Sequence, residues 1–135
     1  MAAVTAALLL AGCGERGASS VAEKAEAQAR DEAESLAPVG TLPQGVAAAQ
    51  GKEGRTLYLR TCVMCHGEQG QGTQLGPALT DTARTGTFDQ IVAVVRDGVA
   101  QPDSFPVPMT PLGDGTLTEP QVRAVAAYAY SIARH

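Results

Sequence analysis

The pattern of apolar and polar positions divides the chain into three parts. Residues 1–12 are nearly all Ala, Val and Leu, and residues 13–50 contain almost no large apolar side chain. From residue 51 onward, apolar side chains recur at helical spacing. The pattern predicts an apolar leader over 1–12, a polar tether over 13–50 and one folded domain over 51–135.

Three helices are predicted in the folded domain. The first, Lys52–Cys62, places Leu57 and Tyr58 close to two cysteines. The second, Phe88–Asp97, and the third, Glu119–Ala133, each follow a threonine with a glutamine three residues later, which is the spacing of a capping box. The segments between them are rich in Gly and Pro and too irregular for strands, so the predicted fold class is all-α.

The composition excludes several classes of protein. The chain has 135 residues, a net charge of −4 and no Trp, and much of its 44% hydrophobic content is Ala. An acidic chain without a basic patch is not expected to bind nucleic acid. No apolar run reaches the roughly 18 residues that a transmembrane helix requires. A small Ala-rich core would gain stability from a bound cofactor.

The strongest chemical motif is Cys62-Val63-Met64-Cys65-His66. The spacing C-x-x-C-H is that of covalent haem c attachment, in which each sulfur adds to a haem vinyl group and the histidine ligates the iron. A thioredoxin-like C-x-x-C would require a βαβ setting, which the helical pattern lacks. A structural zinc site would need four ligands, and neither Cys13 nor His135 is a plausible partner.

The second axial ligand is expected to be Met109. Of the three methionines, Met1 lies in the leader and Met64 lies inside the attachment motif. Prolines on both sides of Met109 stiffen its loop, which suits a side chain that must meet iron with little entropy to lose. Three alternatives are that Met109 is an ordinary apolar residue, that His135 folds back as the ligand, or that the position is open. An apolar cavity bordered by His66 and Met109 is therefore predicted.

Residues 51–133 resemble a monohaem class I c-type cytochrome of the short bacterial kind. The resemblance rests on the attachment motif, Gly67, Gly70, Gly72, the run Gly76-Pro77-Ala78-Leu79, Met109 and Tyr128. It implies three to four helices around one covalent haem, with the first and last helices crossing near Gly54 and Tyr128. It also implies that the carbonyl of Pro77 accepts a hydrogen bond from His66. The family commonly has proline directly after the methionine, whereas here Thr110 intervenes.

The leader ends in Leu10-Ala11-Gly12-Cys13, which resembles the lipobox of bacterial lipoproteins. That resemblance implies a signal peptide over 1–12 and lipidation of Cys13, although no Lys or Arg precedes the apolar run. The alternative is an Ala/Leu-rich start with an incidental cysteine. With lipidation, the domain would be anchored on the periplasmic side of a bacterial membrane.

Imidazole and thioether ligation closes both axial positions of a haem, which favours one-electron transfer over catalysis. The expected function is an electron carrier, not an enzyme, in a respiratory or other periplasmic chain, as a shuttle or as a complex subunit. Its partners would be redox proteins such as a quinol-oxidising complex, a terminal oxidase or a dehydrogenase. The alternatives are a haem-based gas or redox sensor with a labile Met109 and, less favoured, a thiol oxidoreductase.

Overall fold

The computed structural model describes residues 21, 23–28 and 40–135. The chain forms two compact units, Met1–Glu34 and Ser35–His135. In the first unit, Val21 and residues 23–28 are helical and exposed, which fits a polar helix without a core face. The expected signal over 1–12, the lipidation site Cys13 and much of the tether lie outside the described residues.

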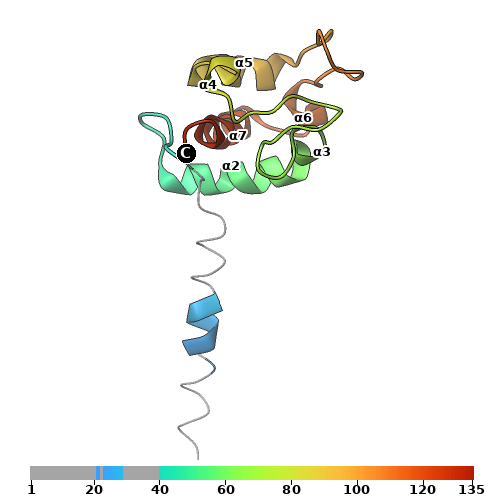
Figure 1. Ribbon diagram of the computed structural model, residues 1–135. Helices are drawn as coiled ribbons and strands as arrows, with labels where there is room; N and C mark the ends of the chain where they lie inside the picture. Colours follow the sequence, from blue (N-terminus) through green and yellow to red (C-terminus); the bar gives the residue numbers. More distant parts are fainter. Residues whose placement is uncertain (1–20, 22, 29–39) are drawn as a thin grey trace, which may run out of the picture. The chain divides into compact units, whose positions relative to one another are not determined.

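The second unit is built around the last helix, α7 (Glu119–Ile132). Figure 1 shows α7 between α2 (Ala48–Thr61), which crosses it on one side, and α5 (Phe88–Asp97) on the other. Nine residues of α7 are buried, four of them alanines. Because alanine side chains are short, two helices can approach α7 closely from opposite sides.

The crossing of α2 and α7 depends on Gly54. A Cβ at this position would overlap the carbonyl of Ala124 and touch the Cβ of Tyr128. The rings of Tyr58 and Tyr128 pack edge to face beside it, with centroids 5.2 Å apart. The expected contact between the first and last helices is therefore present.

Helix α5 has the bounds that the sequence predicts. Thr87 and Gln90 form the expected capping box, and Gly98 ends the helix. The helix buries Ile91, Val92 and Val95 against α7. A side-chain ion pair between Arg96 and Glu119 links the end of α5 to the start of α7.

Helix α7 ends one residue before the predicted bound, and Thr118 and Gln121 stand at its start as expected. Here the side-chain oxygen of Gln121 accepts hydrogen bonds from both the backbone N–H and the hydroxyl of Thr118, at 2.9 and 3.0 Å. These bonds pair polar groups at the start of α7, where the backbone N–H groups have no preceding helical turn to which they could donate.

Two sequence predictions need correction. Helix α2 begins at Ala48, four residues before the predicted start, because alanine favours the helix even without an apolar stripe. The folded unit also begins before residue 51. Pro43 is buried, and the N–H of Thr41 donates to the carbonyl of Arg134, so residues 40–46 pack on the domain instead of belonging to the tether.

Three short helices complete the unit: α3 (Val63–His66), α4 (Thr82–Thr85) and α6 (Leu112–Gly115). Helix α6 is a tight turn, since Gly113 and Asp114 have positive φ. The described residues contain no strand, only an isolated antiparallel bridge between Val99 and Met109. The fold is therefore all-α, as predicted. Across the described part of the chain, no helix has the length and apolarity needed to span a bilayer.

Candidate cofactor-binding cavity

The attachment motif forms one helical turn at the end of α2. Cys62 ends α2 and also precedes α3, and its carbonyl accepts hydrogen bonds from the N–H groups of Cys65 and His66, at 3.2 and 3.0 Å. Met64, between the cysteines, is 76% exposed, whereas both cysteine side chains line a common cavity. The turn therefore directs the two sulfurs to one side and the intervening methionine to the other.

His66 is buried, with its ring fixed by a backbone carbonyl. Its Nδ1 lies 2.9 Å from the carbonyl oxygen of Pro77. A carbonyl can only accept, so Nδ1 carries a proton, and in the neutral ring the lone pair is then on Nε2. Within the described residues, no hydrogen-bond partner reaches Nε2. Such a histidine is oriented to ligate a metal through Nε2.

The segment after His66 is folded tightly around it. The N–H of Gly72 donates to the carbonyl of His66 at 2.7 Å, and the hydroxyl of Tyr58 donates to the carbonyl of Gly67 at 2.7 Å. Gly72 has φ of +81°, and a Cβ there would press on the backbone of Ala78. Glycine is required here because two stretches of backbone meet beside the histidine.

Thr73 closes the same loop on the cysteine side. Its hydroxyl donates to the carbonyl of Cys65 at 2.8 Å and accepts from the N–H of Leu75 at 3.0 Å. Thr73 carries no signal in the sequence, because a single threonine between glycines has no motif of its own. Its contacts show that the polypeptide conformation around both Cys65 and His66 is fixed by hydrogen bonds.

Both cysteines are free and half-buried. Burial raises the pKa of the Cys62 thiol, and the hydrogen bond with the Thr61 hydroxyl only partly opposes this. Cysteines that react as redox nucleophiles have a lowered pKa in an electropositive setting. Cys62 therefore lacks the environment of a catalytic thiol.

Met109 borders the same cavity from a different part of the chain. Its side chain is partly buried against the core, and its backbone pairs with Val99 through two hydrogen bonds of 2.8 and 3.0 Å. His135 does not line the cavity. The structure thus brings Cys62, Cys65, His66 and Met109 to one cavity and leaves the alternative ligand His135 outside it.

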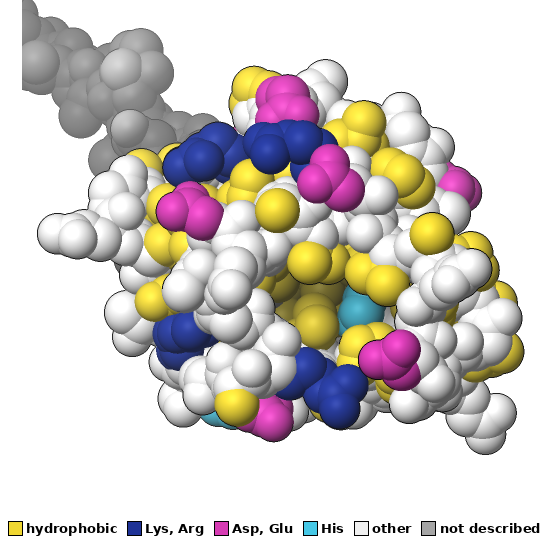
Figure 2. All heavy atoms as spheres, turned by 90° about the horizontal axis from the view of Figure 1, so that it is seen from above, with side chains coloured by type: hydrophobic (Ala, Val, Ile, Leu, Met, Phe, Trp, Pro, Cys, Tyr) yellow, Lys and Arg dark blue, Asp and Glu magenta, His cyan; other side chains and the backbone are white. Residues whose placement is uncertain are grey.

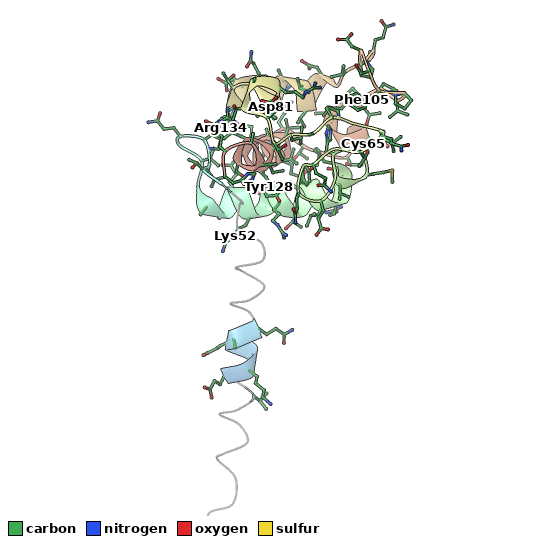
Figure 3. The ribbon with its side chains drawn as sticks, viewed as in Figure 1. Lys52, Cys65, Asp81, Phe105, Tyr128 and Arg134 are labelled. Atoms are coloured by element: carbon green, nitrogen blue, oxygen red, sulfur yellow. The ribbon has the colours of Figure 1, made fainter. Side chains whose placement is uncertain are left out.

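The cavity has a volume of about 430 Å³, which is in the range of cofactor sites. Figure 2 shows it as a hollow with a hydrophobic floor and a histidine in its wall, which is His66 because no other histidine lines it. In Figure 3, Cys65 and Phe105 lie at the same end of the domain, away from Arg134. The walls come mainly from apolar side chains of α5, α7 and the two long loops: Ile91, Val94, Val95, Val125, Ala129, Leu75, Leu79, Val107 and Pro108.

Two charged residues line the cavity, Arg84 and Asp103. Both have exposed side chains, so the charge in the cavity wall is confined to accessible positions. No sequence motif singles them out, because exposed charges of both signs occur throughout the domain.

These residues fit a covalently attached haem. Two thiols on one turn, a histidine with a free Nε2 and a thioether all border an apolar space; haem c attachment uses two thiols and a histidine, and a thioether is a known second ligand of its iron. In the described part of the chain, no three or more His, Cys, Asp or Glu residues cluster as a metal site would need. The donors therefore favour haem over a structural zinc ion.

A helical domain that places a C-x-x-C-H turn on an apolar cavity is a c-type cytochrome, a haem-based electron-transfer protein. Residues 49–128 match the family described as cytochrome c oxidase, cbb3-type, subunit III, and the chain belongs to this family. Among solved structures, it is similar to the c-type cytochrome XoxG from Methylobacterium extorquens AM1, with 21% identity and a TM-score of 0.51. That match covers 63% of this chain and 51% of XoxG, and it supports the fold.

Proposed function

We propose that this protein is a one-electron carrier with a single haem c, attached through Cys62 and Cys65 and ligated by His66 and Met109. The observation that carries the proposal is the apolar cavity that all four side chains line. His66 and Met109 would both hold the iron, leaving no ligand position for oxygen or substrate, and a haem bound in this way would supply one-electron chemistry.

Each residue has a separate task in this proposal. His66 presents Nε2 as a ligand, while the carbonyl of Pro77 holds the ring through Nδ1. Met109 would supply a neutral sulfur, and the apolar walls would limit the water around a bound iron. A low-polarity cavity with fixed donors changes little between the two oxidation states, which favours rapid electron exchange.

We also propose that Cys13 is lipidated after removal of residues 1–12, and that the chain is anchored on the periplasmic side of a bacterial membrane. The support is the sequence Leu10-Ala11-Gly12-Cys13 at the end of an apolar run. Acyl chains gain about 0.8 kcal/mol per buried methylene, so the domain itself needs no membrane contact.

The proposed partners are other redox proteins of the same membrane: a quinol-oxidising complex, a terminal oxidase or a dehydrogenase. The family description names an oxidase subunit, which supports a place as a complex subunit beside that of a mobile shuttle. Electron-transfer interfaces are small and short-lived, and the exposed apolar residues Val94 and Val107 at the cavity would suit one.

The test is to purify the full chain after expression in a host that attaches haem c. We expect one haem per chain that survives denaturing electrophoresis, a weak sulfur-to-iron charge-transfer band in the oxidised protein, and no carbon monoxide binding in the reduced protein. A haem lost on denaturation would contradict attachment through both cysteines. Rapid carbon monoxide binding would contradict the carrier and favour the sensor.

A further inference from the structure

We propose that Gly98 and the backbone pairing of Val99 with Met109 form a positioning element that holds the Met109 thioether at the cavity. This proposal rests on the proposed role of Met109 as an axial ligand. It differs from the sequence-based view, in which the flanking prolines alone stiffen the methionine loop.

The pairing encloses a loop that has little packing of its own. Val99 and Met109 exchange two hydrogen bonds, from the N–H of Val99 and from the N–H of Met109. Most residues between them, 100–108, are exposed. Because such a loop is a poor support, the position of Met109 depends on the closure at its base.

Gly98 makes that closure possible. Its backbone has φ of 71° and ψ of −172°, a region that residues with a side chain scarcely adopt. A Cβ at Gly98 would overlap the carbonyl oxygen of Met109 and lie 2.9 Å from the backbone nitrogen of Pro111. Neither neighbour is the flexible end of a side chain, so the backbone around Met109 would have to move.

Gly98 also connects the pairing to the core. Its N–H donates to the carbonyl of Val94 at 2.8 Å, which fixes it to the last turn of α5. On the same helix, Val92 and Val95 are buried. Met109 is thus connected to the core through its pairing with Val99, through Gly98 and through the last turn of α5.

The test compares Gly98→Ala with Gly86→Ala in the haem-loaded full chain. Gly86 ends α4 with φ of 72° and ψ of −152°, so its backbone is in the same region. A Cβ there would meet the side chain of Gln90, and Gly86 does not line the cavity. It is therefore a control for the same backbone strain at a position that does not contact Met109.

We expect both variants to be less stable to heat, but only Gly98→Ala to lose the sulfur-to-iron band and to bind carbon monoxide in its reduced form. A Gly98→Ala protein that keeps the band and resists carbon monoxide as Gly86→Ala does would overturn the proposal.

A second measurement needs no variant. In the natural protein, hydrogen exchange of the Val99 and Met109 amides should be at least ~10-fold slower than that of Asp103 and Ser104. Equal rates would also overturn the positioning role. If the natural protein itself lacks the sulfur-to-iron band, the proposed ligation fails. A normal band with fast exchange at Val99 and Met109 refutes only the positioning element.

Discussion

The hydroxyl of Tyr58 donates a 2.7 Å hydrogen bond to the carbonyl of Gly67, the residue directly after His66. Both groups are buried, so the bond ties the last turn of α2 to the backbone beside the proposed iron ligand. Loss of the hydroxyl would leave that carbonyl without its partner in a place that water does not easily reach.

We therefore expect Tyr58→Phe to lower the free energy of unfolding by about 1–2 kcal/mol at neutral pH. Burial raises the pKa of Tyr58 above its usual value of 10, so the unfolded chain releases this proton first. The hydroxyl's contribution is complete below pH 10 and declines as the pH rises further. Thermal melts between pH 7 and pH 11 should show natural protein and variant converging.

Tyr130→Phe is the matched control, because no described residue hydrogen-bonds its hydroxyl while its ring packs on Phe88. It should change stability little at any pH. A Tyr58→Phe protein as stable as this control would contradict the role of the hydrogen bond.

Replacing Met109 with leucine keeps an apolar side chain of similar size but removes the sulfur. We expect Met109→Leu to lose the sulfur-to-iron band, to bind carbon monoxide when reduced and to have a lower reduction potential. Absorption spectra and a redox titration measure these changes. Met64→Leu, at a position 76% exposed, should behave as the natural protein does. If Met109→Leu retains the band, Met109 is not the ligand.

Gly54→Ala places a methyl group where α2 and α7 are closest, against the backbone of Ala124. Overpacking of this kind costs about 1–3 kcal/mol, which denaturant unfolding would measure. Thr56→Ala, an exposed change in the same helix, should stay within about 0.5 kcal/mol of the natural protein. If the two variants are equally stable, α2 and α7 accommodate the added methyl group without a loss of free energy of unfolding.

The ion pair between Arg96 and Glu119 predicts a small acid-sensitive contribution to stability. The hydrogen bonds from Arg96 lower the pKa of Glu119 below its usual 4.5, so the contribution is present above pH 4.5 and is lost as the pH falls through the lowered value. The two side chains are 42% and 60% exposed, which keeps the effect modest.

Glu119→Gln should therefore melt slightly below the natural protein at pH 7 and together with it in strong acid. The exposed substitution Glu53→Gln in α2 serves as the control. A difference that persists unchanged in acid would mean that Glu119 acts by some means other than its charge.

Lipid anchoring makes a prediction for Cys13. In cells, the natural protein should sediment with membranes, and Cys13→Ser should appear in the soluble fraction, because the acyl chains have lost their attachment atom. Ser19→Ala, a few residues along the tether, should leave the distribution unchanged. Membrane association of Cys13→Ser would indicate that the apolar leader or a partner retains the chain.

The elements that the sequence predicts well are those with both a capping signal and an apolar face. Helix α5 has the expected bounds, since Thr87, Gln90 and Gly98 mark its two ends. Helix α2 begins earlier than expected, because residues 47–50 are small or polar and carry no periodic signal.

The candidate donors around the cavity could be named from the spacing of the motif and by elimination among the methionines. The hydrogen bonds that hold these residues in place could not be predicted in this way. Pairing between Val99 and Met109 involves only backbone atoms, which leave no pattern in the side chains. The left-handed conformation of Leu112, with φ of 52°, is likewise unexpected for that residue type. Such features depend on contacts between segments distant in sequence.

Residues 40–46 pack against the end of α7. A force that pulls on residue 40 would therefore act on the domain at this end of α7. Thr41 bonds to Arg134, while Cys62 follows the last residue of α2, a helix of 14 residues that is about 20 Å long. No residue of this segment borders the cavity. A force applied at residue 40 would therefore be borne by the end of α7 and not by the walls of the cavity.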